Sequence, residues 1–179
     1  MVSKEIFENI ELKMREGVTK EEIFKELGAY DDLAGALAAT PEFSAREKYK
    51  IHNFVLVIAI YCYALLKLTT SILLIKNNNL PIFSYLLTLI VPAIALVFAR
   101  EIWKFKGGFY LIASLLGFSV LIRSFGEGIS LYTSNDWIIW GVINFPVIIV
   151  MFLAYYLKRK LCPNLKFIGA RTVNGTYKF

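Results

Sequence analysis

The chain has 179 residues, of which 57% are hydrophobic, 15% aromatic and only 19% charged. Soluble domains carry about 25% charged residues, so this composition excludes an ordinary water-soluble domain and indicates an integral membrane protein. Residues 1–51 hold 8 Lys and Arg against 11 Asp and Glu, whereas residues 52–179 hold 12 against 3. The N-terminal segment therefore offers no basic surface, which argues against nucleic acid as a partner.

Residues 1–43 are predicted to form a cytosolic segment of two or three short helices. The first residues contain no apolar core of the length of a secretory signal, so we expect the N-terminus to lie in the cytosol. Thr19 and Glu22 form a capping box ahead of a short apolar set. A segment of about 40 residues is too small to be confidently stable alone. We expect it to pack against the loop 100–107, another subunit or a protein partner.

Four apolar runs follow, each near the ~20 residues that cross a bilayer core of ~30 Å. Ser44 and Glu47 form a second capping box directly before the first run. The predicted membrane domain covers residues 44–157, with spanning helices at about 52–75, 80–99, 108–131 and 137–157. The predicted fold class is therefore all-α, a polytopic membrane protein with four transmembrane helices.

The basic residues predict how these helices cross the membrane. They gather before the first run, between the second and third, and after the fourth, while the other two connections offer only Lys76. By the positive-inside rule both termini are cytosolic. The plan resembles that of many small bacterial membrane proteins, which favours a bacterial inner membrane. Residues 158–179 form a short cytosolic tail, in which Asn174-Gly175 is typical of a two-residue hairpin turn, although a simple tail is the alternative.

A few polar side chains within the predicted spans are costly. A charge near the bilayer centre costs roughly 2.5–3.5 kcal/mol, and only Lys67, Arg123 and Glu127 are ionised there. Lys67 and Arg123 each lie ~12 Å from the outer ends of their helices, and Thr88 and Asn144 reach a similar depth. The sequence thus predicts a polar intramembrane layer in the outer half of the bilayer.

Three interpretations of this layer stay open. In a structural role, Arg123 pairs with Glu127, Lys67 extends to the headgroups and Asn144 bonds to a neighbouring helix. In a functional role, the same residues line a water-filled cavity, where two cations against one carboxylate favour an anion. In the third interpretation, the charges pair between subunits.

Two further patterns concern how the helices bend and pack. Pro92 and Pro146 lie inside the second and fourth predicted spans, where each removes an amide donor and is expected to kink its helix. The third span carries small residues on one face, which lets another helix approach closely, in this subunit or a second. These residues are Ala113, Gly117, Ser124 and Gly128.

The sequence offers no motif for catalysis, for a cofactor or for a metal ion. We therefore expect a non-enzymatic, oligomeric membrane protein without cofactor or metal that acts as a partner-binding, accessory or immunity-type component. Its partners are the lipid bilayer and either a second copy or another protein, bound through the N-terminal helices. The alternative is a small channel or transporter for an anion or another ion, with the net cationic layer around its pathway.

Overall fold

The structure is a computed structural model that describes residues 4–28, 31–77, 82–128, 134–166, 169–173 and 176–179. The side chains of residues 4–5, 73–88 and 126–139 lie outside this description. The elements are α1 Lys4–Arg15, α2 Lys20–Glu26, α3 Asp31–Ala39, α4 Phe43–Lys48, α5 Lys50–Asn77, α6 Ile82–Trp103, α7 Gly107–Gly128, α8 Ser134–Leu161, β1 Arg171–Val173 and β2 Thr176–Lys178.

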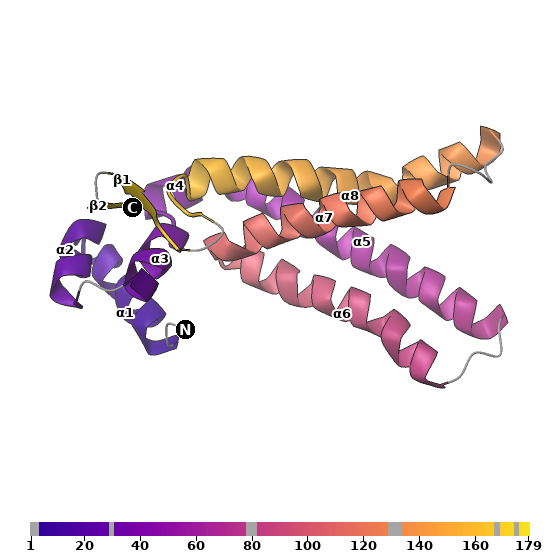
Figure 1. Cartoon of the computed structure of the whole chain (residues 1–179), viewed down its shortest axis with the longest axis horizontal. Coiled ribbons are helices and arrows are strands. Elements are labelled where there is room, and N and C mark those ends of the chain that lie inside the picture. The colour runs from indigo at the N-terminus through magenta and orange to yellow at the C-terminus, as the bar shows by residue number, and fades with distance from the viewer. Residues whose placement is uncertain (1–3, 29–30, 78–81, 129–133, 167–168, 174–175) are drawn as a thin grey trace.

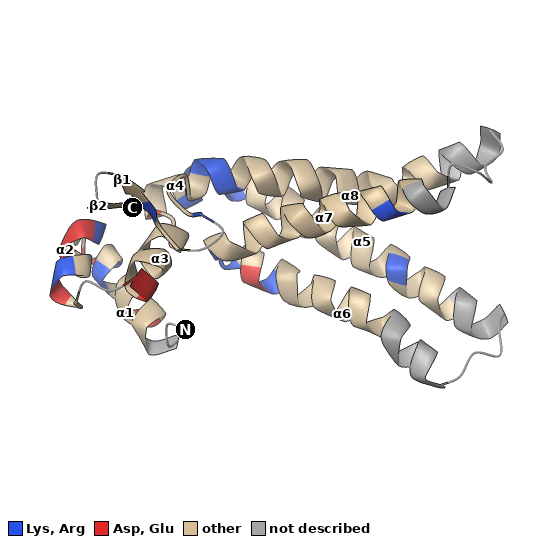
Figure 2. Ribbon diagram, in the orientation of Figure 1, with Lys and Arg blue, Asp and Glu red and all other residues tan. Residues whose placement is uncertain are grey.

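The molecule has two parts, which Figure 1 shows side by side along its longest axis. The helices α1–α4 and the two strands form a small head, and α5–α8 extend away from it as four long helices. Lys and Arg gather where the long helices meet the head, whereas Asp and Glu are prominent on α2 and at the start of α3, as Figure 2 shows. We call the ends of α5–α8 near the head the proximal ends, and the opposite ends the distal ends.

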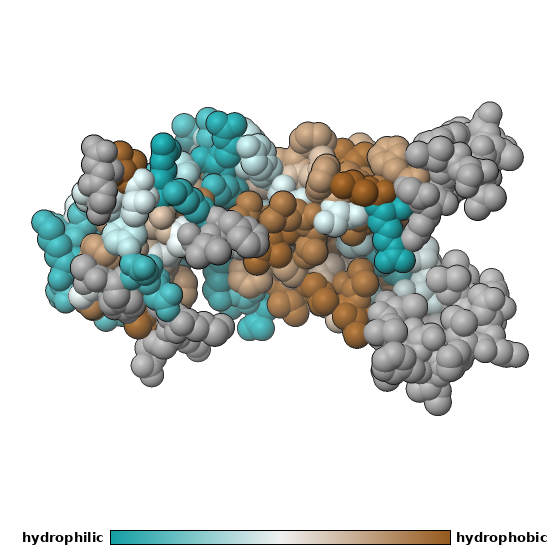
Figure 3. All heavy atoms as spheres, in the orientation of Figure 1, coloured by the Kyte–Doolittle hydropathy of each residue, from teal (hydrophilic) through white to brown (hydrophobic). Residues whose placement is uncertain are grey.

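Among the described residues, three of the long helices contain segments that are long and apolar enough to cross a membrane. These segments are Lys50–Ile72, Gly107–Phe125 and Trp140–Leu161. Large apolar side chains stand exposed along them, and the middle of the long helices is mainly brown, hydrophobic surface in Figure 3. The membrane class is thus supported for three helices, while the fourth predicted span, 80–99, lies partly outside the described side chains and stays a prediction.

The head is built around a small apolar core. Ile10 of α1, Ile23 of α2, and Leu33 and Leu37 of α3 are fully buried against one another. The capping box predicted at the start of α2 is confirmed, because the Glu22 amide donates to Thr19 Oγ1 and the Thr19 amide donates to the Glu22 carboxylate. This helix-start signal is local, which explains why the sequence alone reveals it.

The second predicted capping box, Ser44 with Glu47, is wrong. Ser44 already lies inside α4, whose N-cap is Glu42 without a side-chain cap hydrogen bond. Glu42 is still extended, the backbone turns helical directly after it at Phe43, and the Glu42 carbonyl accepts the first bond, from the Arg46 amide. A residue with helical backbone cannot serve as the N-cap, which needs an extended conformation.

The C-terminal tail folds as a hairpin and covers the head. Strand β1 pairs with β2 in antiparallel register, with Val173 opposite Thr176. The rings of Tyr177 and Phe179 contact Phe24 of α2, with centroids 5.4 and 5.2 Å apart. The predicted hairpin is confirmed over a simple tail. The all-α prediction is corrected to a mostly helical fold with one two-stranded sheet. Part of the burial that the small head needs thus comes from its own chain.

The four long helices are packed unequally. Helix α5 packs extensively against α6 and α8, and α7 packs extensively against α8, whereas α6 and α7 touch far less. The pairs α5/α6 and α7/α8 diverge toward their distal ends in Figure 1. At the proximal end a tight turn joins α6 to α7, with Phe105 in the left-handed region at φ 58° and the Lys106 amide donating to the Glu101 carbonyl. This arrangement closes the bundle near the head and opens it distally.

A buried polar contact fixes the proximal end. The Tyr110 hydroxyl of α7 donates to Asn53 Oδ1 of α5 over 2.7 Å, and Asn53 Nδ2 donates to the Ile102 carbonyl of α6 over 3.0 Å. Tyr110 and Asn53 are both almost completely buried. Three helices are thus joined at one level, since buried polar groups are stable only when they are paired.

Candidate functional site: an apolar cavity between two helix pairs

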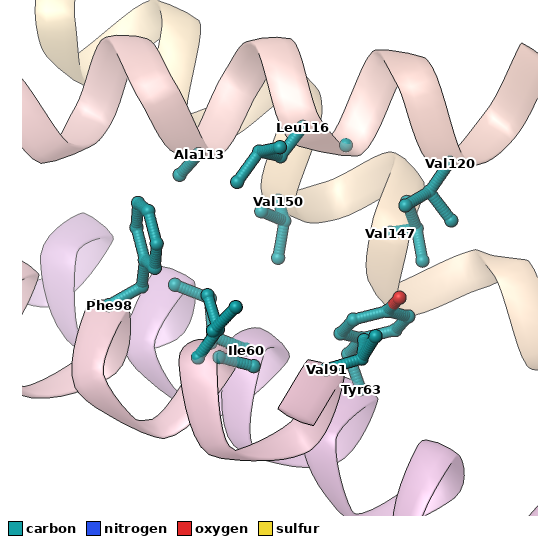
Figure 4. Close-up of a pocket in the computed structure, with 12 residues that line it drawn as sticks. Ile60, Tyr63, Val91, Phe98, Ala113, Leu116, Val120, Val147 and Val150 are labelled. Atoms are coloured by element: carbon teal, nitrogen blue, oxygen red, sulfur yellow. The ribbon is translucent and has the colours of Figure 1, made fainter. Parts of the chain in front are cut away.

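A cavity with the character of a binding site lies between the two helix pairs. It has a volume of about 240 Å³, and all four long helices contribute to it. Figure 4 shows side chains of both pairs facing it, with Phe98 and Ala113 toward one end and Tyr63 and Val120 toward the other. Its lining residues are Ile60, Tyr63, Val91, Ile94, Ala95, Phe98, Ala113, Leu116, Gly117, Val120, Val147 and Val150.

The chemistry of the lining is almost wholly apolar. Among the described residues that line it, only Tyr63 has a polar side-chain atom. Val91, Ile94 and Leu116 line the cavity and are nevertheless 44–46% exposed. The cavity is therefore open to the side, where α6 and α7 lie apart. Ligand sites are typically concave and mainly apolar, with a few placed polar groups, and the cavity fits that description.

Lys67 and Arg123, the two cations of the predicted polar layer, come to similar levels of the bundle. Counted from the shared Asn53–Tyr110 hydrogen bond, Lys67 lies about 21 Å along α5 and Arg123 about 20 Å along α7, at the rise of an α-helix. Lys67 is partly buried, with its Nζ 5.9 Å from the centroid of the Tyr63 ring. Arg123 is exposed on α7. Both cations lie distal to the cavity.

The other three residues of the predicted layer are placed differently. Asn144 of α8 is buried, and its Nδ2 donates to the Trp140 carbonyl one turn earlier in the same helix, over 2.9 Å. A bond to its own helix satisfies the amide donor without a neighbouring helix. The side chains of Thr88 and Glu127 lie outside the described residues. Whether this layer is wet or structural thus stays a prediction.

The predicted kink positions lie close to the cavity. Pro92 is buried in α6 and Pro146 is buried in α8, and each helix continues on both sides of its proline. Their neighbours Val91 and Val147 line the cavity. Proline leaves the carbonyl four residues earlier without its helical partner, so both helices are locally weakened at this level. A bend at either proline stays a prediction.

The small-residue face of α7 is turned toward α8 of the same chain. A methyl group built on Gly117 would lie 3.3 Å from Met151 Cβ, so the two helices approach closely there. Ser124 Oγ accepts a bond of 2.7 Å from the Trp140 indole, and Ala113 is buried beside the cavity. Gly128 is the last residue of α7. Since α8 occupies this face, the small residues do not indicate a dimer seam.

Outside the long helices, burial shifts the pKa of two groups in the head. Burial raises the pKa of the Cys162 thiol to about 11, and its Sγ lies 3.6 Å from the Ala39 carbonyl oxygen. Burial also lowers the pKa of Lys20. Both groups lie at the junction between the head and the proximal ends of the long helices. Their burial explains these shifts, because desolvation disfavours the charged form.

Two features of the site were not predicted from the sequence. The cavity lining reads as ordinary apolar helix, because a residue that faces lipid and one that faces a cavity have the same hydropathy. The Asn53–Tyr110 contact was also missed. Its signal was a single Asn near the start of an apolar run, and no spacing rule connects it to a Tyr on a distant helix.

Comparison with protein-family models, with curated protein sequences and with solved structures finds no match for this chain. Within the described part of the chain, no group of three or more His, Cys, Asp or Glu side chains is placed to hold a metal ion.

Proposed function

We propose that this chain is a non-enzymatic integral membrane component that binds an apolar partner between its helix pairs α5/α6 and α7/α8. The observation that carries the proposal is the side-open cavity of about 240 Å³ with its apolar lining. An ion pathway needs polar groups or water along its length, and such a lining offers neither. The geometry therefore supports binding over conduction.

The proposal includes a fourth membrane crossing by α6. This helix has 22 residues, which corresponds to about 33 Å and is enough to cross the bilayer core. It packs along α5, and its described residues Leu89, Ile94 and Val97 are exposed as a lipid-facing helix requires. The basic residues at the proximal end favour a cytosolic head under the positive-inside rule, in a bacterial inner membrane.

Two measurements test binding against conduction. The purified protein in liposomes should pass neither K⁺ nor Cl⁻ above the rate of protein-free liposomes. In a second measurement, a spin label is placed at residue 116, which lines the cavity, or at residue 115 as a matched control. Both leucines are 46% exposed, but only Leu116 is part of the lining. A water-soluble nickel reagent should reach neither label, because both positions face an apolar medium.

The alternative, a small channel or transporter, makes the opposite prediction. It requires anion flux whose charge selectivity changes in Lys67→Gln, together with access of the nickel reagent to residue 116 but not to residue 115. Those results would replace the binding proposal. A mass measurement in detergent determines the number of subunits, and an oligomer is expected on the basis of the sequence.

A further inference from the structure

We propose that the partner in the cavity is the end of one acyl chain of an anionic phospholipid, whose phosphate lies distal to the cavity on the side of Lys67. This inference rests on the proposed function and names the ligand class of the same site. It follows from the medium around the cavity, from its size and from the position of Lys67.

The first argument is the medium that surrounds the opening of the cavity. The cavity opens to the side between α6 and α7, within segments that are apolar enough to lie in a membrane. The molecules that meet this opening are lipid chains, since water is absent from the bilayer core. An apolar cavity is also unfavourable for water, which needs polar partners to enter. A hydrocarbon chain matches the apolar lining, and it is also the molecule that is abundant in the bilayer core.

The size of the cavity indicates a single chain. Apolar cavities of roughly 150 Å³ hold one benzene molecule, and this cavity has about 240 Å³. Along α7 the lining extends from Ala113 to Val120, which is about 10 Å at the rise of a helix. This length suits part of one acyl chain, and the second chain of the lipid stays in the bilayer.

Charge then determines the headgroup. Lys67 follows the lining residue Tyr63 by one helical turn, and Arg123 follows the lining residue Val120 by about one turn. A cation beside the distal end of an apolar cavity complements a lipid whose anionic phosphate sits above its chain. Lys67 can reach toward the headgroup level, because its long side chain keeps an apolar stem in the hydrocarbon.

The test uses two photoreactive lipids with the same diazirine-bearing acyl chain, one a phosphatidylglycerol and the other a phosphatidylcholine. The full chain is reconstituted in phosphatidylcholine vesicles with a small fraction of either probe, and labelled residues are mapped by peptide mass spectrometry. In the wild-type protein, the cavity-lining residues should be labelled several-fold more by the phosphatidylglycerol probe.

Matched variants separate the two parts of the inference. Leu116→Trp fills the cavity and should abolish the labelling of lining residues, whereas Leu115→Trp, on the adjacent and equally exposed residue, should leave it unchanged. Lys67→Gln should make the two probes equivalent, Lys67→Arg should retain the preference, and Lys158→Gln at the proximal end should have no effect. Size-exclusion profiles check that each variant is folded.

Two outcomes would overturn the inference. If the lining residues are labelled equally in Leu116→Trp and Leu115→Trp, no acyl chain occupies the cavity. If the cavity is labelled but Lys67→Gln keeps the preference for phosphatidylglycerol, the assignment of an anionic headgroup fails. Neither result decides the proposed function, which depends on the flux and nickel-access measurements, so the two failures are distinguishable.

Discussion

Single residues at the junction between the head and the long helices carry the clearest chemistry of this molecule. Asn53, Tyr110, Gly107 and Cys162 are all buried there, and each contacts an element other than its own. Sequence reasoning emphasised the distal half instead, because an ionised residue in an apolar run is conspicuous and a buried neutral amide is not. Lys67 and Arg123 were located by that reasoning, whereas the cavity below them needed the three-dimensional packing of four helices.

Tyr110→Phe should destabilise the protein by about 1–3 kcal/mol, because Asn53 Oδ1 is left buried without its donor. The measurement is the loss of folded protein with temperature in detergent. Tyr61→Phe is the matched control, since Tyr61 is 43% exposed, and it should change little. Equal melting of the two variants would show that the hydroxyl of Tyr110 is not needed.

Gly107→Ala should also destabilise the junction, by about 1–3 kcal/mol, because the added methyl group would overlap the Ala39 carbonyl oxygen and Cys162 Sγ. Gly108→Ala meets no atom within 4 Å and serves as the control. The rate at which a maleimide labels Cys162 should rise in Gly107→Ala alone. Similar rates in both variants would contradict the close contact.

The reactivity of Cys162 should depend on pH in a defined direction. Burial raises the pKa of this thiol from 9.0 to about 11, so the reactive thiolate is scarce near pH 8 and becomes abundant only as the pH approaches 11. In the unfolded chain the Cys162 thiol ionises near pH 9, which stabilises the unfolded state above that pH. The contribution of the buried neutral thiol to the stability of the fold is therefore present below pH 9 and is lost between pH 9 and 11. Labelling rates of Cys162 measured from pH 7 to 10, in Cys62→Ala, should keep rising. A plateau near pH 9 would mean that the thiol is solvated.

At the scale of elements, the hairpin of β1 and β2 has the largest effect on the head. The Asn-Gly pair and its flanking residues identified this hairpin, because turn chemistry is local. Its docking on α2 and α3 was not predictable, since it depends on contacts between residues more than 140 positions apart, such as Tyr177 donating to Asp31. The capping box predicted at Ser44 was wrong for a different reason. The spacing of Ser/Thr and Glu also occurs by chance inside helices, so the motif alone does not identify a helix start.

Phe24→Ala should release the hairpin from the head. Phe24 contacts the rings of Tyr177 and Phe179, and each aromatic pair contributes about 0.5–1.5 kcal/mol beyond its buried area. Limited proteolysis should then cut within residues 166–179 several-fold faster than in the wild-type protein. Leu12→Ala, at an exposed position of the head, is the control. Unchanged protection in Phe24→Ala would show that other contacts hold the hairpin.

At the scale of the whole molecule, composition and run length were sufficient to predict long apolar helices, and the described residues include three segments that are long and apolar enough to cross a membrane. They were also sufficient to place four long helices close to their observed bounds. The divergence of the two helix pairs was not predictable, because apolar helices in lipid have no hydrophobic drive to close every gap between them.

The fourth crossing is tested by thiol labelling of intact cells. In a chain with both native cysteines replaced by alanine, Asn78→Cys should react with a membrane-impermeant reagent added outside, whereas Lys104→Cys and Lys160→Cys should not. The reason is that α6 separates residue 78 from residue 104, while both α6 and α8 end at the proximal side. Labelling of residues 78 and 104 from the same side would rule out a crossing by α6.

The covering of the head by the hairpin also sets an order of events during synthesis. The ribosome makes α1–α3 first, but Phe24 finds part of its cover on Tyr177 and Phe179, which are made only after all of the long helices. The head is therefore completed last, after α8 has been made. A chain that stops before residue 176 would leave this part of the head uncovered.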